Sequence, residues 1–140
     1  MADQVVTSEQ WMEHREAPGG VACYYVKWKT ATAGTFVLKL AKCPVLSGRL
    51  VQLVTKPSAT AQPDDDYDVT LVSSMHGNDL LLGAGVNRDE SDTETSVIMS
   101  EVTIGANTYG AHPLVNECNP VLTISGAGNE LEGEVWIYLE

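Results

Sequence analysis

Histidine is the residue type best suited to proton transfer near neutral pH, and this chain has three of them, at positions 14, 76 and 112. None stands at the spacing of a known catalytic or metal motif, because the sequence contains no HExxH, no GxSxG and no P-loop. Gly83-Ala84-Gly85 and Gly126-Ala127-Gly128 are bare GxG segments, which indicate flexible loops. We therefore predict no catalytic residues and a protein that is not an enzyme.

Carboxylates and thiols are the other groups that could hold a ligand. Asp64, Asp65, Asp66 and Asp68 form a dense acidic run that could bind Ca²⁺, but it lacks the ligand spacing and the glycine of an EF-hand loop. We expect a solvated acidic loop there, with calcium as the alternative. The cysteines are three in number and widely spaced, at positions 23, 43 and 118, and none forms a CxxC pair. The sequence therefore predicts free thiols, no structural zinc and no cofactor; one disulfide is the alternative.

Length and composition are those of one acidic, soluble domain. The chain has 140 residues, 44% of them hydrophobic, and a net charge of −11. An acidic balance of this size argues against binding to nucleic acid or to an anionic membrane surface, both of which need lysine and arginine. No apolar run approaches the roughly 20 residues of a membrane span, and the first ten residues do not resemble a signal peptide. We expect a protein made in the cytoplasm, with neither nucleic acid nor membrane as partner.

The charges divide along the chain. Residues 1–60 hold seven basic and four acidic residues, whereas residues 61–140 hold fifteen acidic residues and one basic residue, Arg88. One interpretation is two solvated surfaces of different sign. The other is a pair of complementary surfaces that meet between subunits, with Lys27, Lys29 and Lys39 facing acidic loops of a neighbour.

Residues 7–16 carry the local signals of a short helix. Thr7 and Gln10 have the spacing of a capping box, Glu9 suits the first turn, and Pro18-Gly19-Gly20 would stop the helix. Ten residues are marginal for an isolated helix, so it must dock on something. We therefore divide the chain into an N-terminal arm with a short helix (1–20) and a β-sandwich domain (21–140).

After Gly20 the pattern is that of short strands. Apolar and polar residues alternate, or apolar runs occur, in segments that are separated by turn residues: 21–29, 35–42, 46–55, 67–71, 80–82, 95–104, 121–125 and 131–139. We expect residues 105–118 to be irregular. About eight strands with no later helix predict an all-β, single-domain β-sandwich of the jelly-roll kind.

The last strand places two large aromatic residues away from the core. If Val135, Ile137 and Leu139 face inward, then Trp136 and Tyr138 face outward. Aromatic residues on an outer face are common at protein interfaces, although another part of the same chain could cover them. Trp136 and Tyr138, with Trp11 of the expected helix, join the three lysines as candidate subunit or capsid contacts.

The sequence resembles small structural proteins of tailed bacteriophages. The resemblance rests on Leu53–Pro57 with Tyr67–Leu71, on Gly77–Leu81 followed by the glycine-rich loop Gly83–Glu94, and on the ending from Ala127 to Leu139. It covers roughly residues 46–96 and 119–140, and it implies no catalytic residues. It implies a virion protein, with a capsid decoration (cement) protein as the main expectation. Such a protein would be assembled in the host cytoplasm and would bind the major capsid protein, often as a homotrimer.

Two other functions remain open. A neck, tail or fibre component would belong to the same virion but at a lower copy number. A carbohydrate-binding β-sandwich module would use Trp11, Trp28 and Trp136 to stack on sugars.

Overall fold

The computed structural model describes residues 3–14 and 20–140. The described residues form eleven strands and no helix. The strands are β1 (Val5–His14), β2 (Val21–Lys29), β3 (Phe36–Lys39), β4 (Leu46–Pro57), β5 (Asp68–Val72), β6 (Glu94–Val97), β7 (Ser100–Ile104), β8 (Asn107–Ala111), β9 (Leu114–Glu117), β10 (Val121–Ser125) and β11 (Glu132–Leu139). The expectation of an all-β chain is confirmed.

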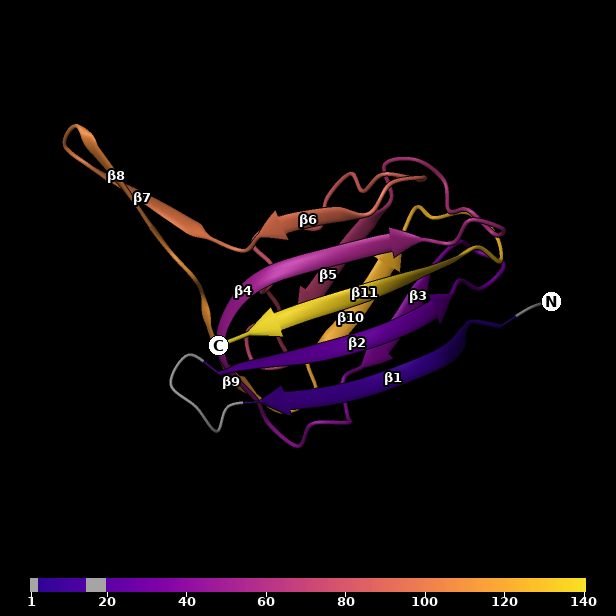
Figure 1. Cartoon of the computed structure of the whole chain (residues 1–140), viewed down its shortest axis with the longest axis horizontal. Helices are drawn as coiled ribbons and strands as arrows, with labels where there is room; N and C mark the ends of the chain where they lie inside the picture. Colours follow the sequence, from indigo (N-terminus) through magenta and orange to yellow (C-terminus); the bar gives the residue numbers. More distant parts are fainter. Residues whose placement is uncertain (1–2, 15–19) are drawn as a thin grey trace.

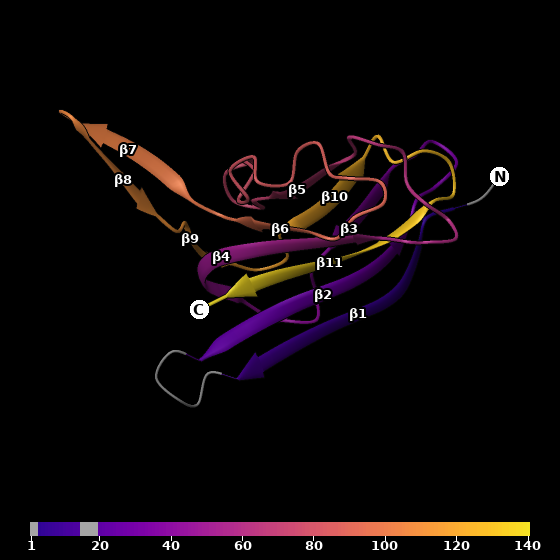
Figure 2. The ribbon, with the colours of Figure 1, turned by 45° about the horizontal axis from the view of Figure 1, so that its top comes forward.

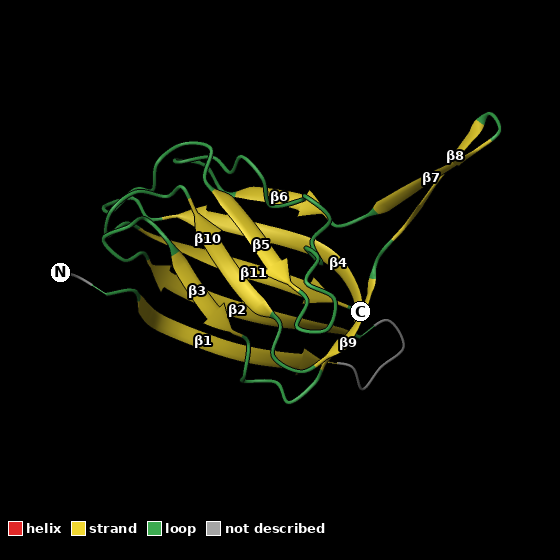
Figure 3. Cartoon of the chain, turned by 180° about the vertical axis from the view of Figure 1, so that it is seen from behind, coloured by secondary structure: helices red, strands yellow, loops and turns green. Residues whose placement is uncertain are grey.

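Two sheets lie one over the other (Figures 1 and 3). The larger has the order β1-β2-β11-β4-β6, with β9 pairing to the far part of β4, and the smaller has the order β3-β10-β5. All these neighbours are antiparallel. Strands β7 and β8 pair only with each other among the described strands, and they project from one end of the molecule (Figure 1).

The predicted N-terminal helix is wrong. Residues 5–14 form β1, which pairs with β2 from Val5–Lys29 to His14–Val21, with one bulge between Val6 and Ser8. Tyr24 helps to explain why these residues form a strand rather than a helix. Its hydroxyl donates a hydrogen bond to Glu9 of β1 and accepts one from the Lys42 amide at 2.8 Å. A ladder of this length outweighs the local capping signals of a ten-residue helix. The end of the expected helix and its stop signal fall at residues 15–19, outside the described residues.

The core fills the space between the sheets, and Trp28 lies at its centre. Its ring centroid lies 6.5 Å from that of Phe36 on the opposite sheet and 5.7 Å from that of Tyr67. The inward positions of β2 and β11 are those that the alternation predicts, and Val26, Val135 and Ile137 are all at most 1% exposed. The inner face of β2 and β11 thus belongs to the core, so a binding surface on these two strands must be their outer face.

Two parts of the chain differ from the strand pattern expected of the sequence. Leu80–Leu82 lie in turns rather than in a strand, and residues 105–118 contain β8 and β9 rather than irregular chain. The segment 95–104 is divided between β6 and β7, with the fully buried Ile98 between them. These differences all come from the regions that carry the turns and the projecting hairpin.

Arg88 is a structural residue and adds no charge to the surface. Its side chain is 2% exposed and donates hydrogen bonds to Thr55 Oγ1 at 2.8 Å and to Ser96 Oγ at 2.6 Å. It also donates to the backbone oxygens of Ala84 at 2.9 Å and Glu94 at 3.0 Å. Arg88 therefore fastens the long loop before β6 to β4.

Candidate contact surfaces

Four of the six predicted contact residues lie on one surface, the outer face of the larger sheet. Lys27 and Lys29 come from β2, and Trp136 and Tyr138 come from the neighbouring β11. All four are half-buried, which matches the expectation that the two aromatic residues face away from the core. The pleat places them together because β2 and β11 are hydrogen-bonded neighbours with one register.

The centre of this outer face is aromatic. Tyr25 lies opposite Trp136 in the ladder, and their ring centroids are 5.0 Å apart with the planes tilted by 38°. Burial raises the pKa of Tyr25, and the charge of Glu134 and a hydrogen bond with it raise it further. Tyr138 lies beside Cys23, and burial together with this thiol also raises the pKa of Tyr138. We call Tyr25, Trp136 and Tyr138 the aromatic face.

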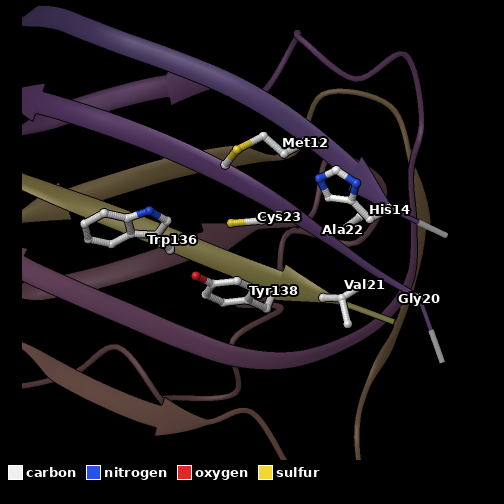
Figure 4. A pocket seen from close by; sticks show the side chains of 8 residues that line it. All are labelled: Met12, His14, Gly20, Val21, Ala22, Cys23, Trp136 and Tyr138. Atoms are coloured by element: carbon white, nitrogen blue, oxygen red, sulfur yellow. The ribbon is translucent and has the colours of Figure 1, made fainter.

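At the end of the sheet the aromatic face becomes a shallow pocket of about 520 Å³ (Figure 4). We call it the end pocket. Trp136 and Tyr138 of β11 border it on one side and Met12 and His14 of β1 on the other, with Cys23 between them (Figure 4). The other described residues that line it are Gly20, Val21 and Ala22. Because β1 supplies one wall, this pocket could not be predicted while residues 7–16 were expected to form a helix.

Toward the other end of the sheet the outer face is charged. Glu134 lies opposite Lys27 of β2 on one side and opposite Lys56 of β4 on the other. Glu132 lies opposite Lys29 in the same way. Positive and negative side chains, which are separated along the sequence, therefore alternate across this sheet. The lysines of β2 thus have acidic neighbours within their own chain.

The structure places the other two predicted contact residues elsewhere. Lys39 is exposed at the end of β3, in the smaller sheet. Trp11 lies on the inner side of β1, where its ring centroid is 6.0 Å from that of Tyr24. Trp28 is completely buried and cannot stack on a sugar, so Trp136 is the one of the three candidate tryptophans that lies on the outer face.

The second surface is the projecting hairpin of β7 and β8, residues 100–111, which we call the hairpin arm. Every side chain described in it is exposed, including Ile104 at 66% and Tyr109 at 55%. Figure 2 shows it extending away from both sheets. Its base carries further exposed apolar side chains, namely Val97, Met99 and Leu114.

The body of the molecule holds the base of the hairpin arm on both sides. The Ile98 amide donates to Val51 O at 3.1 Å, and the Leu50 amide donates to Pro113 O at 2.9 Å. The His112 ring bridges the two sides, with Nδ1 2.7 Å from Ile98 O. The arm is therefore attached to β4 at its base, while every side chain described in its outer part is exposed.

The described residues contain no group of three or more histidine, cysteine or acidic side chains placed to hold a metal ion. Asp64, Asp65 and Asp66 are exposed, and Asp68 accepts a hydrogen bond from the Asn87 amide at 2.9 Å. None of the three cysteines forms a disulfide; Cys23 and Cys43 are buried and Cys118 is exposed. Among the residues that the structure describes, no helix is long and apolar enough to span a bilayer.

Comparison with known proteins leaves the family open. No family model matches the chain, and no curated protein matches it. A solved structure titled "BiXyn10A CBM1 APO", a xylanase carbohydrate-binding module, aligns over 99% of this chain and 98% of that chain, with 10% identity and a TM-score of 0.35. A similarity at this level carries no argument about the function of this chain.

Proposed function

We propose that this chain is a non-enzymatic structural protein of a tailed-phage virion. In its most specific form, this proposal is that the chain is a capsid decoration (cement) protein that binds the major capsid protein on the surface of the head as a homotrimer. Its two facing sheets suit the jelly-roll-like β-sandwich expected of such a protein. The role needs rigid surfaces that bury area against neighbours and so stabilise the assembled shell by mass action.

The observation that carries the proposal is the hairpin arm. An isolated two-stranded hairpin is marginally stable in water, and exposed apolar side chains on a projecting element mark a site of protein contact. Ile104 and Tyr109 are more than half exposed at the outer part of the arm. Such an element suits a protein that assembles with neighbours on a shell.

The test is to locate and count the protein in purified virions of the phage that encodes it. A decoration protein gives a band of intensity comparable to that of the major capsid protein, and it remains on heads separated from tails. A band equal to a few copies per particle would move the protein to the neck, tail or fibre. Its absence from virions would contradict the proposal altogether.

The aromatic face supports a second candidate function, carbohydrate binding. Tyr25 and Trp136 lie side by side on an open sheet surface, where a ring face can stack on a sugar. A glycan array and a pull-down with insoluble polysaccharide test this function. Binding that is lost in Trp136→Ala and kept in Trp11→Ala would favour it over the virion role, because only Trp136 lies on the outer face.

A further inference from the structure

We infer that the hairpin arm of one copy of this chain docks in the end pocket of a second copy. This inference rests on the proposed function, because it names the contact by which the decoration protein would form its oligomer. The two surfaces belong to the same chain, both are largely apolar, and both leave described apolar side chains exposed in a single copy. Their match in chemistry is the first support for the contact.

The apolar side chains of the two surfaces are complementary. The arm offers Ile104 and Tyr109, and the pocket offers Met12, Val21 and the rings of Trp136 and Tyr138. Met12 is 36% exposed and Val21 is 39% exposed at the pocket border. A pocket of about 520 Å³ is of the size that takes a few side chains.

The net charge of the molecule favours contact through these two surfaces rather than through others. Two copies that each carry −11 repel one another over most of their surface. Residues 100–111 contain one charged residue, Glu101, and the described lining residues of the end pocket include no Asp, Glu, Lys or Arg. His14 belongs to that described lining and is suited to meet Glu101 of the incoming arm. Copies can therefore approach closely through this contact without bringing acidic loops together.

The arm cannot reach its own pocket. It leaves the body beside β6 and β9, on the other side of the larger sheet from the β1–β2 edge, and points away from that edge (Figures 1 and 2). The contacts of Ile98 and Pro113 with β4 hold its base in that direction. A contact between two different surfaces of one chain is heterologous, and it closes into a ring when the rotation between copies allows. Three copies in a ring agree with the homotrimer proposed above.

Met99 adds to the apolar surface at the base of the arm. Its side chain occupies the space where a Cβ at Gly110 would lie, so the glycine lets Met99 fold over the base of the hairpin. Met99 remains 42% exposed there and extends the apolar surface of the arm toward the body. The contact can therefore extend from Ile104 at the tip to Met99 at the base.

Mixed cross-linking tests the contact directly. Two variants are made on a Cys118→Ser background, Tyr109→Cys in the arm and Met12→Cys at the pocket border. Each is purified alone and they are then mixed with a short bismaleimide reagent. The inference predicts a cross-linked dimer containing one of each variant, identified by mass. Cross-links within one variant alone, or none in a sample that light scattering shows to be oligomeric, would overturn it.

A second measurement separates this contact from the proposed function. The double variant Ile104→Ser/Tyr109→Ser should raise the dissociation constant of the oligomer about 30-fold or more, as expected for two central interface residues. Met75→Ser is the control, since Met75 is 67% exposed in the turn that follows β5 and is not part of the arm, and it should change nothing. If the double variant still forms the oligomer but no longer binds virions, the arm contacts the capsid, and the inference fails while the proposed function stands. If the wild-type protein is absent from virions, the proposed function fails whatever the oligomer does.

Discussion

At the scale of single residues, several side chains have roles that residue type alone does not reveal. Arg88 is the single basic residue in residues 61–140, yet it is buried and ties a loop to β4. Trp28 could have stacked on a ligand, and it fills the core instead. The alternation within β11 placed Trp136 and Tyr138 outward correctly, because two-residue periodicity depends only on the local strand. The partners of Arg88 come from distant parts of the chain, so no local pattern could reveal them.

The three thiols should differ sharply in reactivity. Burial raises the pKa of Cys23 to about 11, against the smaller lowering effects of hydrogen bonds with Tyr138 and Ile137, and Cys43 is buried beside Val45 O at 2.8 Å. Because the thiolate is the reactive form, a maleimide should label Cys118 alone in the folded protein and all three cysteines in urea. Cys118→Ser should abolish the fast labelling. Rapid modification of Cys23 in the folded protein would contradict the burial of this thiol and its raised pKa.

Glu117 should make stability depend on pH in the acid range. Its burial acts to raise the pKa, but hydrogen bonds from Ser73 Oγ at 2.7 Å and from the Ser74 amide at 2.6 Å outweigh it. The pKa of Glu117 in the folded state therefore lies below its ordinary value of 4.5. The stability that Glu117 contributes is present above that ordinary value and is lost as the pH falls through the lowered one.

Glu117→Gln should lower the free energy of unfolding by about 1–3 kcal/mol at neutral pH, since a buried charge-assisted acceptor is lost. The difference between the variant and the wild type should shrink as the pH is lowered below the ordinary pKa of 4.5 and through the lowered pKa of the folded state. Urea denaturation at several pH values measures this. A difference that stays constant with pH would contradict the assignment.

At the scale of elements, the strands with strict alternation were predictable and those decided by distant pairing were not. Residues 21–29 and 121–125 form strands with the expected limits. Residues 5–14 also alternate, with Glu9 and Trp11 on opposite sides from Gln10 and Met12, but the capping signals favoured a helix. Only the neighbour β2 decides between the two, and no local pattern contains that information.

The hairpin arm had a recognisable signal that the sequence analysis missed. Its turn is the two-residue segment Gly105-Ala106 between the paired residues Ile104 and Asn107, and Gly105 has a φ of 63°. A glycine with positive φ at the first central position is typical of a two-residue hairpin turn. The alternation that ends at Ile104 could therefore have been continued through the turn into β8.

Strand β1 should be part of the cooperative fold rather than a separate arm. Trp11 packs on Tyr24 and against the core from the edge of the larger sheet. Trp11→Ala should therefore lower the free energy of unfolding by about 2 kcal/mol, less than for a fully buried tryptophan. Met75→Ala, at a 67% exposed position, is the control in the same urea titration and should change little. Equal stability of the two variants would mean that β1 detaches freely.

The hairpin arm should be dispensable for folding. Its described side chains are all exposed, so replacing residues 100–111 by a short Gly-Ser linker removes little buried surface. We expect the free energy of unfolding of the monomer to change by less than about 1 kcal/mol. Loss of the cooperative urea transition would show instead that the arm is needed for the fold.

At the scale of the whole molecule, net charge and exposed apolar surface have opposite effects on association. The sequence suggested that basic strands of one subunit meet acidic loops of the next. In the folded chain Lys27 and Lys29 already have Glu134 and Glu132 as cross-strand neighbours. The remaining acidic excess makes copies repel, whereas the hairpin arm and the described lining of the end pocket carry little charge. Association through them should be driven by apolar burial and opposed by net charge.

The most direct test of this account is light scattering of the wild-type protein after size exclusion, at low and at high salt concentration. The account predicts a mass about three times 15.1 kDa at both salt concentrations. Association of the copies should be equally strong or stronger at high salt, because salt screens the repulsion between copies and leaves apolar contacts intact. A trimer that dissociates at high salt would contradict the apolar contact and restore complementary charges as its cause. A monomer at every concentration and salt would contradict assembly through the chain's own surfaces.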